Sequence, residues 1–370
     1  MNPNLRHVLC AAALASAVTG APVAAQTTPP SAGPTHPPAK FYQNPDGSFR
    51  RYHNSIVTSI WSGYAVTAGP YSSASGTWQV PSVTNDGAPN QPYNEEAADN
   101  WVGIGGDGDS TLIQLGTSGT VFTNGTTSYG AWYELYPAGA VGISNSVKPG
   151  DIITASLQCT AACSPSSVQT WQLSLTNTTA GWTWTQSFQY QSTMASAEWI
   201  LEAPQVGGIV PLPDYVQTTF ESVEANGQNP NLSLSANGII MQDPSGETSN
   251  PSAPVNGDTF STCWGAIGAA LTPCTAGSFT IPPPAPTASL SASPTKISAG
   301  QSSTLTWSST NATSCTGSNF NASATSGSAT VAPTVTTSYS VKCTGNGGSA
   351  SSLATVSVGS TTTCHAKHCK

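Results

Sequence analysis

Short runs that alternate hydrophobic and polar residues recur along the chain from about residue 55, separated by turn-forming residues. A period of two predicts β-strands with one buried face, and frequent turns are typical of a sandwich. No stretch has the 3.6-residue period of a long amphipathic helix. The pattern therefore predicts an all-β protein with an antiparallel β-sandwich. The expected strands include SGTWQVPSV, NWVGIGG, TLIQLGT, SYGAWYELYP, DIITASLQC, TWQLSLTN, WTWTQSFQY, AEWILEAP and YVQTTFESV.

The first 25 residues contain Arg6, the apolar run VLCAAALASAV and small residues that end before Gln26. This arrangement indicates a cleaved secretory signal, residues 1–25, because the apolar run is shorter than the roughly 20 residues of a membrane-spanning helix. We therefore expect a secreted, extracellular protein with no membrane segment.

Residues 26–54 are rich in proline at first and then basic, which predicts a propeptide or a linker. Such a segment is either a disordered spacer or a basic leader that covers an acidic cleft and leaves when carboxylates protonate. Residues 55–281 form the main sandwich domain. PPPAPT, residues 282–287, is expected to be a stiff linker.

Residues 288–358 resemble a small immunoglobulin-like β-sandwich module, with Trp307 in its core. The tail, residues 359–370, contains CHAKHCK, for which a disulfide is favoured over a metal site. Once Cys10 is removed with the signal, eight cysteines remain, an even number that suggests disulfides in an oxidising compartment. Short loops favour local pairs, namely Cys159 with Cys163, Cys263 with Cys274, Cys315 with Cys343, and Cys364 with Cys369.

The net charge of −8 is unevenly distributed, because residues 55–281 contain sixteen Asp and Glu side chains and a single Lys or Arg, Lys148. An acidic body argues against nucleic-acid binding, which requires a basic surface. It also predicts tolerance of acid, since protonation of the carboxyls leaves the domain nearly neutral instead of self-repelling.

The main domain contains no histidine. Unless an outlying segment reaches in, this excludes Ser-His-Asp and Cys-His hydrolases and His-ligated zinc sites. The run GIGGDG lacks the βαβ context of a dinucleotide site, and Asp107 and Asp109 are only a fragment of a calcium loop. We therefore expect no metal and no cofactor.

Read as strands, three segments each place polar or aromatic residues on one face. Glu198 and Glu202 lie on the face away from Trp199. The shared faces comprise Leu112 and Gln114; Trp132, Glu134 and Tyr136; and Glu198, Ile200 and Glu202.

These motifs, in the order WVGIxGD, a Gln strand, AWYExYP and AEWIxE, together with IWSGYAV and GTWQVPSV, resemble the glutamic peptidase (eqolisin) family over roughly residues 55–225. The resemblance implies a lectin-like sandwich, acid endopeptidase activity on protein or peptide substrates, and a catalytic pair at Gln114 and Glu202. Supporting and cleft residues would be Trp101, Asp107, Trp132, Glu134, Tyr136 and Glu198.

The sequence departs from the fungal pattern of the family, with Gly105, Ser118 and Gly130 at positions where an Asp is common. Two other functions stay open. A carbohydrate enzyme or lectin would use paired carboxylates and Trp side chains for sugars, and a non-catalytic adhesin would bind through the C-terminal module. A monomer is expected.

Overall fold

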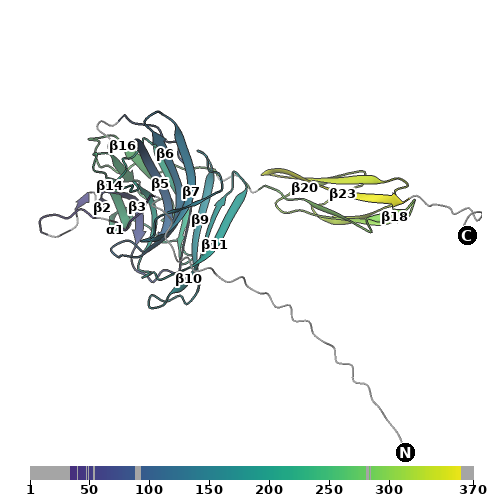
Figure 1. Ribbon diagram of the computed structural model, residues 1–370, viewed down its shortest axis with the longest axis horizontal. Helices are drawn as coiled ribbons and strands as arrows, with labels where there is room; N and C mark the ends of the chain where they lie inside the picture. The colour runs from purple at the N-terminus through teal and green to yellow at the C-terminus, as the bar shows by residue number, and fades with distance from the viewer. Residues whose placement is uncertain are drawn as a thin grey trace, which may run out of the picture.

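The computed structural model describes residues 34–359, apart from residues 40, 47, 49, 53–54, 88–92, 281–282 and 284. These residues form a main β-domain and a smaller C-terminal β-domain (Figure 1). In this part of the chain the only helix is α1 (Leu234–Asn237), and no helix is long and apolar enough to cross a membrane. The predicted signal and the predicted pair Cys364–Cys369 lie outside the described residues.

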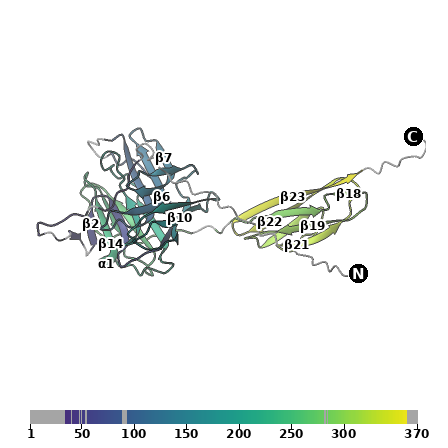
Figure 2. The ribbon, with the colours of Figure 1, turned by 60° about the horizontal axis from the view of Figure 1, so that its bottom comes forward.

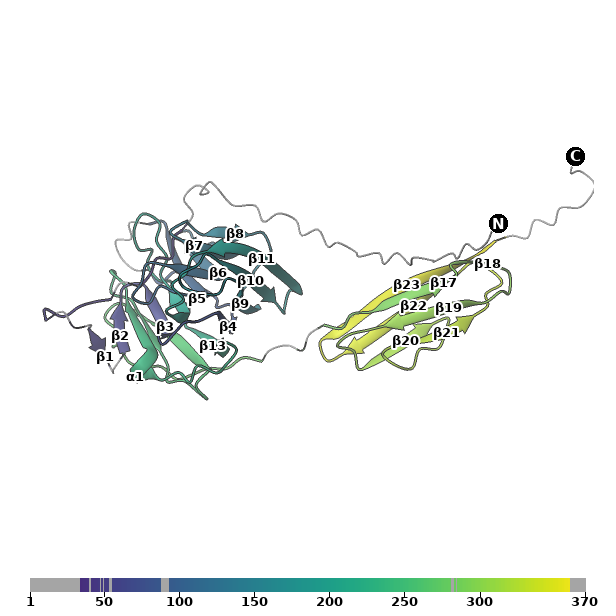
Figure 3. The same ribbon diagram turned by 90° about the horizontal axis from the view of Figure 1, so that it is seen from below.

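The strands of the main domain are hydrogen-bonded in one path that folds over into two layers (Figures 1 and 3). Side chains bridge the layers: Trp199 Nε1 donates to Ser75 O over 2.7 Å, and Trp78 Nε1 donates to Thr117 Oγ1 over 3.0 Å. One layer has the order β11 (Trp182–Tyr190), β10 (Gln169–Asn177), β9 (Ile152–Ala161), β4 (Ser73–Gln79) and β13 (Gln217–Ala225). The facing layer has the order β3 (Trp61–Val66), β12 (Ala197–Glu202), β5 (Glu95–Ile104), β6 (Leu112–Phe122), β7 (Thr127–Tyr136) and β8 (Val141–Ile143).

Three strands connect the layers, namely β16 (Phe260–Gly265), β15 (Thr248–Pro251) and β14 (Gly238–Gln242). Two further strands lie off this path: β2 (Ser55–Thr58) pairs with β14 in parallel, and β1 (Arg51–Tyr52) pairs with β2. Every other strand pair in this domain is antiparallel within the described residues. The predicted antiparallel sandwich is therefore confirmed.

All nine predicted strand segments contain strands, and their buried faces meet between the layers. The core includes Trp78, Trp171, Trp199 and Phe220, all fully buried. Burying one large apolar side chain contributes about 1.5–3 kcal/mol. Because Trp199 faces this core, Glu198, Ile200 and Glu202 on β12 lie on the opposite face of the sheet.

Strands β14, β15 and β16 were not predicted from the sequence pattern. Each is six residues or shorter, and β15 has the polar sequence TSNP, which has neither alternation nor β-branched side chains beyond Thr248. These strands depend on hydrogen bonding to neighbours distant in sequence, which a local pattern does not reveal.

The C-terminal domain is a separate two-sheet sandwich (Figure 2). Its core contains Trp307 as predicted, with Leu305, Tyr339 and Val341. One sheet contains β17 (Ser289–Ser293), β19 (Ser303–Ser308) and β21 (Gly327–Val331), and the other contains β18 (Lys296–Ser298), β23 (Gly348–Gly359), β22 (Thr337–Gly345) and β20 (Ser314–Ser318).

Three of the predicted disulfides are formed, Cys159–Cys163, Cys263–Cys274 and Cys315–Cys343. The bond Cys315–Cys343 joins directly opposite residues of neighbouring strands in one sheet. The disulfide of an antibody domain instead joins two sheets. The immunoglobulin-like assignment stays a prediction.

One group of buried carboxyls in the main domain consists of Glu96 and Glu247, which lie near Asp86 and Asp243. Burial raises the pKa of Glu96, and the charge of Asp86 raises it further. Burial likewise raises the pKa of Glu247, with Asp86 and Asp243 adding to the effect. These groups therefore hold protons in the folded state at pH values where the unfolded chain has lost them.

A raised carboxyl pKa stabilises the fold below the unfolded value, and this stability is lost as the pH rises through the folded value. We expect the free energy of unfolding to fall by about 1–3 kcal/mol between about pH 4 and pH 8, since each pKa unit is worth about 1.4 kcal/mol per group. Urea unfolding at a series of pH values measures this. Glu247→Gln should flatten the profile, whereas a wild-type stability that rises with pH would contradict the expectation.

Candidate active site

The outward face of β12, β5, β6 and β7 carries the predicted site residues in three rows. In antiparallel neighbours, directly opposite residues share a face. The first row is Glu198, Gly103, Gln114 and Glu134; the second is Ile200, Trp101, Gly116 and Trp132; and the third is Glu202, Asp99, Ser118 and Gly130. The structure thus places Gln114 and Glu202 on the same face.

Glycines leave space within these rows for the ring of Trp101. A Cβ at Gly103 would lie 2.8 Å from Trp101 Cζ3, and a Cβ at Gly116 would lie 2.6 Å from Trp101 Cβ. The ring can therefore lie along the sheet and direct its Nε1 atom toward Glu202, to which it donates a hydrogen bond of 2.7 Å.

A short N-terminal segment, residues 34–39, covers this face. Its backbone pairs with the loop after β12, since Thr35 N–H donates to Gln205 O over 2.9 Å and Gln205 N–H donates back over 3.0 Å. Ala39 N–H donates to Gly106 O over 3.2 Å. His36 and Pro37 are buried, so the segment is seated in the cleft.

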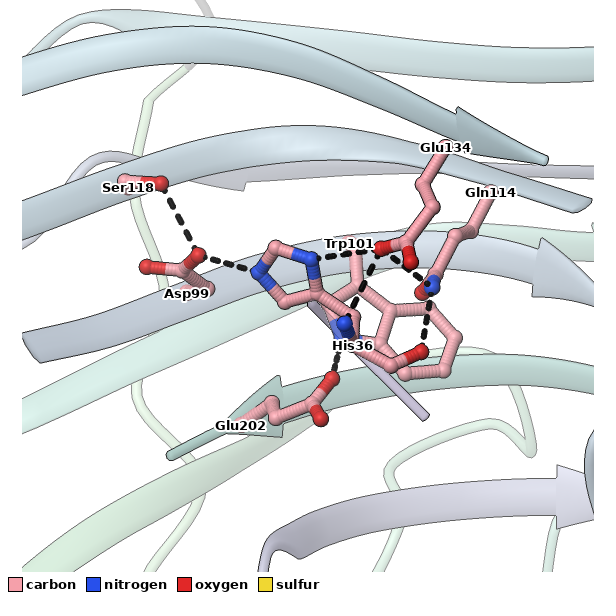
Figure 4. Close-up of polar contacts among 7 residues, drawn as sticks. All are labelled: His36, Asp99, Trp101, Gln114, Ser118, Glu134 and Glu202. Carbon is pink, nitrogen blue, oxygen red and sulfur yellow. Dashed lines mark hydrogen bonds and ion pairs between the residues drawn. The ribbon is translucent and has the colours of Figure 1, made fainter. Parts of the chain in front are cut away.

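The ring of His36 occupies the centre of the site (Figure 4). Its Nε2 atom lies 2.5 Å from Asp99 Oδ2, and its Nδ1 atom lies 2.8 Å from Glu134 Oε2. The ring also stacks on Trp132, with centroids 3.8 Å apart and planes 4° apart. Because each ring nitrogen faces a carboxylate acceptor, His36 is an imidazolium that donates from both nitrogens.

Burial alone would lower the pKa of His36, but the hydrogen bonds to Asp99 and Glu134 outweigh it and raise the pKa from 6.5 to about 10. The ring therefore stays charged throughout acidic and neutral solution. This also limits its chemistry, because an imidazolium has no lone pair with which to act as a base.

The backbone of His36 is held as well. Its N–H donates to Glu134 Oε2 over 3.0 Å, and its carbonyl oxygen accepts a hydrogen bond of 2.8 Å from Gln114 Nε2. Gln114 Nε2 also lies 3.4 Å from Glu134 Oε2. The side-chain amide of Gln114 therefore binds a peptide carbonyl in this structure.

Glu202 lies near His36 in the cleft, where its Oε2 atom accepts the hydrogen bond from Trp101 Nε1 (Figure 4). Burial raises the pKa of Glu202 well above its ordinary value; the positive charge of His36 and the hydrogen bond from Trp101 oppose the shift. The charges of Glu134 and Asp99 raise the pKa further. Glu202 is thus a carboxyl poised to hold a proton while the segment is in place.

Three other predicted residues lie outside this contact network. Glu198 lies in the row of Gln114, on the far side of Gly103, and burial raises its pKa well above the ordinary value, with Asp107 and Asp109 adding to the effect. Burial and the charge of Asp109 raise the pKa of Asp107 to about 6. Tyr136 packs at the edge of the apolar cluster on this face. Among the described residues, the hydrogen-bond partners of His36 are Asp99, Glu134 and Gln114 instead.

Two residues of the site were absent from the sequence prediction. Asp99 is two residues before Trp101 on a strand, so a period of two already put both on one face. His36 comes from the segment before the main domain. His-dependent chemistry was excluded from the sequence only on the condition that no such segment reaches the site. His36 forms no Ser-His-Asp triad here, because the nearby Ser118 hydroxyl donates to Asp99 Oδ2 over 2.9 Å rather than to the imidazole.

Metal binding has no support in the part of the chain that the structure describes, where no three His, Cys, Asp or Glu residues are grouped to hold an ion. In the loop that contains Asp107, the Asp109 carboxylate accepts hydrogen bonds from Thr111 N–H and from the hydroxyls of Thr111 and Thr193. Its oxygens thus stabilise the loop.

Comparison with known proteins identifies relatives of the main domain. Aspergillopepsin-2 of Aspergillus niger is 29% identical over 192 residues, which cover 46% of this chain and 66% of that protein, so the chain spans slightly less than two thirds of this relative. Two solved structures are similar: scytalido-glutamic peptidase with a transition state analog inhibitor (24% identity, TM-score 0.42) and SCP-B, a member of the eqolisin family, with the tripeptide Ala-Ile-His (23%, TM-score 0.40). Each alignment covers 56% of this chain and 98% of the solved one.

The profile of the Peptidase A4 family matches residues 59–264, more than half of the chain. The match runs past the expected limit near residue 225 and includes β14, β15 and β16, the strands that complete the fold between the two layers. The chain therefore belongs to the Peptidase A4 family.

Proposed function

We propose that this protein is a secreted acid endopeptidase in which Glu202 and Gln114 hydrolyse peptide bonds. The observation that carries the proposal is the hydrogen bond from Gln114 Nε2 to the His36 carbonyl, with Glu202 held in the same cleft by its hydrogen bond from Trp101. This contact supports the proposal, because Gln114 would donate to the carbonyl oxygen of a substrate in the same way. The three disulfides of the described residues fit an oxidising compartment.

In the proposed reaction a substrate peptide replaces residues 34–39. Ionised Glu202 takes a proton from a water molecule as the water oxygen attacks the scissile carbonyl carbon. Gln114 Nε2 donates to the oxygen, which becomes an oxyanion. When the C–N bond breaks, the protonated Glu202 gives its proton to the departing nitrogen, so that an acid and an amine are formed and Glu202 is ionised again.

The uncharged amide of Gln114 suits acidic conditions, because it does not titrate there and keeps its donor. A carboxyl with a reference pKa of about 4.3 is a partly ionised base in acid, whereas an imidazole is then fully protonated. Departure of residues 34–39 would admit water to Glu202 and remove part of the burial that raises its pKa.

Glu202→Gln and Gln114→Ala test the catalytic pair. We expect Glu202→Gln to reduce cleavage of acid-denatured casein at about pH 3–4 to background, because no base remains. Gln114→Ala should lower kcat about 100- to 1,000-fold, the usual effect of removing one oxyanion donor. Initial rates measured by release of fluorescent peptides give both values.

Glu224→Gln is the matched control, since it removes one exposed carboxylate from β13 in the other layer. It should retain full activity. Full activity in Gln114→Ala would favour a two-carboxylate carbohydrate enzyme, in which Gln114 is dispensable. A correctly folded, acid-treated protein that cleaves no protein at any pH would favour the adhesin.

The docked segment also predicts latency. Residues 34–39 block the cleft while the charged ring of His36 lies between the carboxyl groups of Asp99 and Glu134, with Glu202 and the Trp132 ring completing its surroundings. Acid in general weakens an ion pair between a histidinium and carboxylates, because the carboxylates take up protons while the histidinium keeps its own. The protein should be inactive at neutral pH and become active after acidification.

His36→Gln should shorten the lag before cleavage begins after a jump from pH 7 to about pH 3.5, a value below the carboxyl reference range. The neutral side chain forms no ion pair and so binds the cleft more weakly. Arg50→Gln, which removes a positive charge from the N-terminal region outside the cleft, should leave the lag unchanged. An unaltered lag in His36→Gln would show that His36 does not hold the segment in place.

A further inference from the structure

The ring of His36 lies in a pocket formed by Asp99, Glu134 and Trp132, hereafter the cation pocket. All three side chains come from neighbouring strands of one layer, β5 and β7 with β6 between them. Asp99 and Glu134 are 1% and 0% exposed, and each places one oxygen within 2.8 Å of a ring nitrogen.

The charge of this pocket requires a positive occupant. Buried carboxylates without a counter-charge are strongly destabilising. The only Lys or Arg in residues 55–281 is Lys148, which lies in the turn before β9, so the main domain brings no cation of its own to the site. Asp99 Oδ1 and Glu134 Oε1 have no hydrogen-bond partner among the described residues, so the pocket has acceptor capacity to spare.

The shape of the pocket favours a flat cation. Trp132 forms one wall, and the His36 ring lies parallel to it at 3.8 Å. The two carboxylates approach different ring nitrogens in that plane. A planar group with N–H donors on two edges, an imidazolium or a guanidinium, fits this arrangement, whereas an ammonium is a point donor with no flat face to stack.

The backbone of His36 sets the position of the cation pocket relative to the candidate catalytic residues. The His36 carbonyl binds Gln114 Nε2, and the His36 N–H binds Glu134. A substrate residue bound in this way presents its own carbonyl to Gln114, and its side chain enters the cation pocket.

We propose that Asp99, together with Glu134 and Trp132, selects substrates in which the residue supplying the attacked carbonyl carries a planar cation, with histidine preferred and arginine next. This inference rests on the proposed peptidase function and adds its substrate class. Asp99 is its specificity-determining residue, because Glu134 also holds the backbone and Trp132 would stack on neutral rings as well.

Residues 34–39, which occupy the cleft in this structure, are a poor substrate because a proline follows His36. The bond after the bound carbonyl joins His36 to Pro37, whose nitrogen carries a ring carbon instead of a hydrogen. That carbon crowds the nitrogen that Glu202 would protonate, and the ring restricts the residue before it. Residues 34–39 therefore bind as a substrate does but resist cleavage.

The substrate preference is tested with the acid-activated full chain and four peptides that differ only in the residue before the scissile bond, His, Arg, Gln or Leu. We expect kcat/KM at about pH 4.5, where free imidazole is protonated, to be highest for His, then Arg, and lowest for Gln and Leu. In Asp99→Asn, the His and Arg peptides should lose about 10- to 100-fold, the usual effect of removing a charged hydrogen-bond partner. The Leu peptide should lose less than either of them, because its side chain forms no ion pair with Asp99.

The outcomes separate this inference from the proposed function. Cleavage of all four peptides at equal rates, or an equal loss for all four in Asp99→Asn, overturns the cation pocket but leaves the peptidase intact. Cleavage of none overturns the proposed function itself. Glu224→Gln controls for the loss of one negative charge, and the ranking by the unmutated protein decides the question even if Asp99→Asn does not fold.

Pro37→Ala provides a second test that needs no synthetic substrate. With an ordinary peptide nitrogen after His36, we expect acidification to produce a new N-terminus at residue 37, detected by intact-mass measurement. The double variant with Glu202→Gln should not produce it. If Pro37→Ala yields no cleavage after His36 while the protein digests casein, the His36 carbonyl does not occupy the position of the attacked carbonyl.

Discussion

The charged ring of His36, held between the carboxylates of Asp99 and Glu134, is the interaction on which the arrangement of the cleft depends. A sheet face that contains Asp99, Glu134 and Glu202 without a Lys or Arg is electrostatically incomplete, since buried carboxylates need a counter-charge or a proton. The N-terminal segment supplies the charge through one imidazolium. Its backbone hydrogen bonds to Gln205 and Gly106 fix where that charge can lie.

The outward face of this layer can carry polar groups because the hydrophobic core between the two layers does not need their side chains. Trp199 and Trp78 bury their rings between the layers and bond across them, so the outward side chains of β12 and β5 are free to form a cleft. Cross-strand register then aligns polar groups in rows, and Gly103 and Gly116 leave room for Trp101 to reach Glu202. Rigid strands, rather than loops, therefore position the candidate catalytic pair, which favours a fixed geometry.

The same scarcity of basic residues shapes stability. Glu96 and Glu247, away from the cleft, have pKa values raised by burial and by neighbouring acids, as Glu202 has within it. Protonation of these carboxyls stabilises the folded domain, whereas protonation of carboxylates destabilises most proteins. At Glu96 and Glu247, protonation relieves the repulsion among buried carboxyls, and this favours the folded domain in acidic solution.

The sequence by itself determined nine strand segments of the sandwich and the sharing of one face by Glu198, Ile200 and Glu202, and it favoured the three disulfide pairs, because alternation and short loop closure are local properties of the chain. Family resemblance pointed to Gln114 and Glu202. Only the tertiary structure decided that Asp99 and His36 lie in the cleft and that Glu198 lies in the row of Gln114. Register between strands and the docking of a leader onto a distant sheet join residues far apart in the chain, and the periodicity of one segment contains no information about its neighbours.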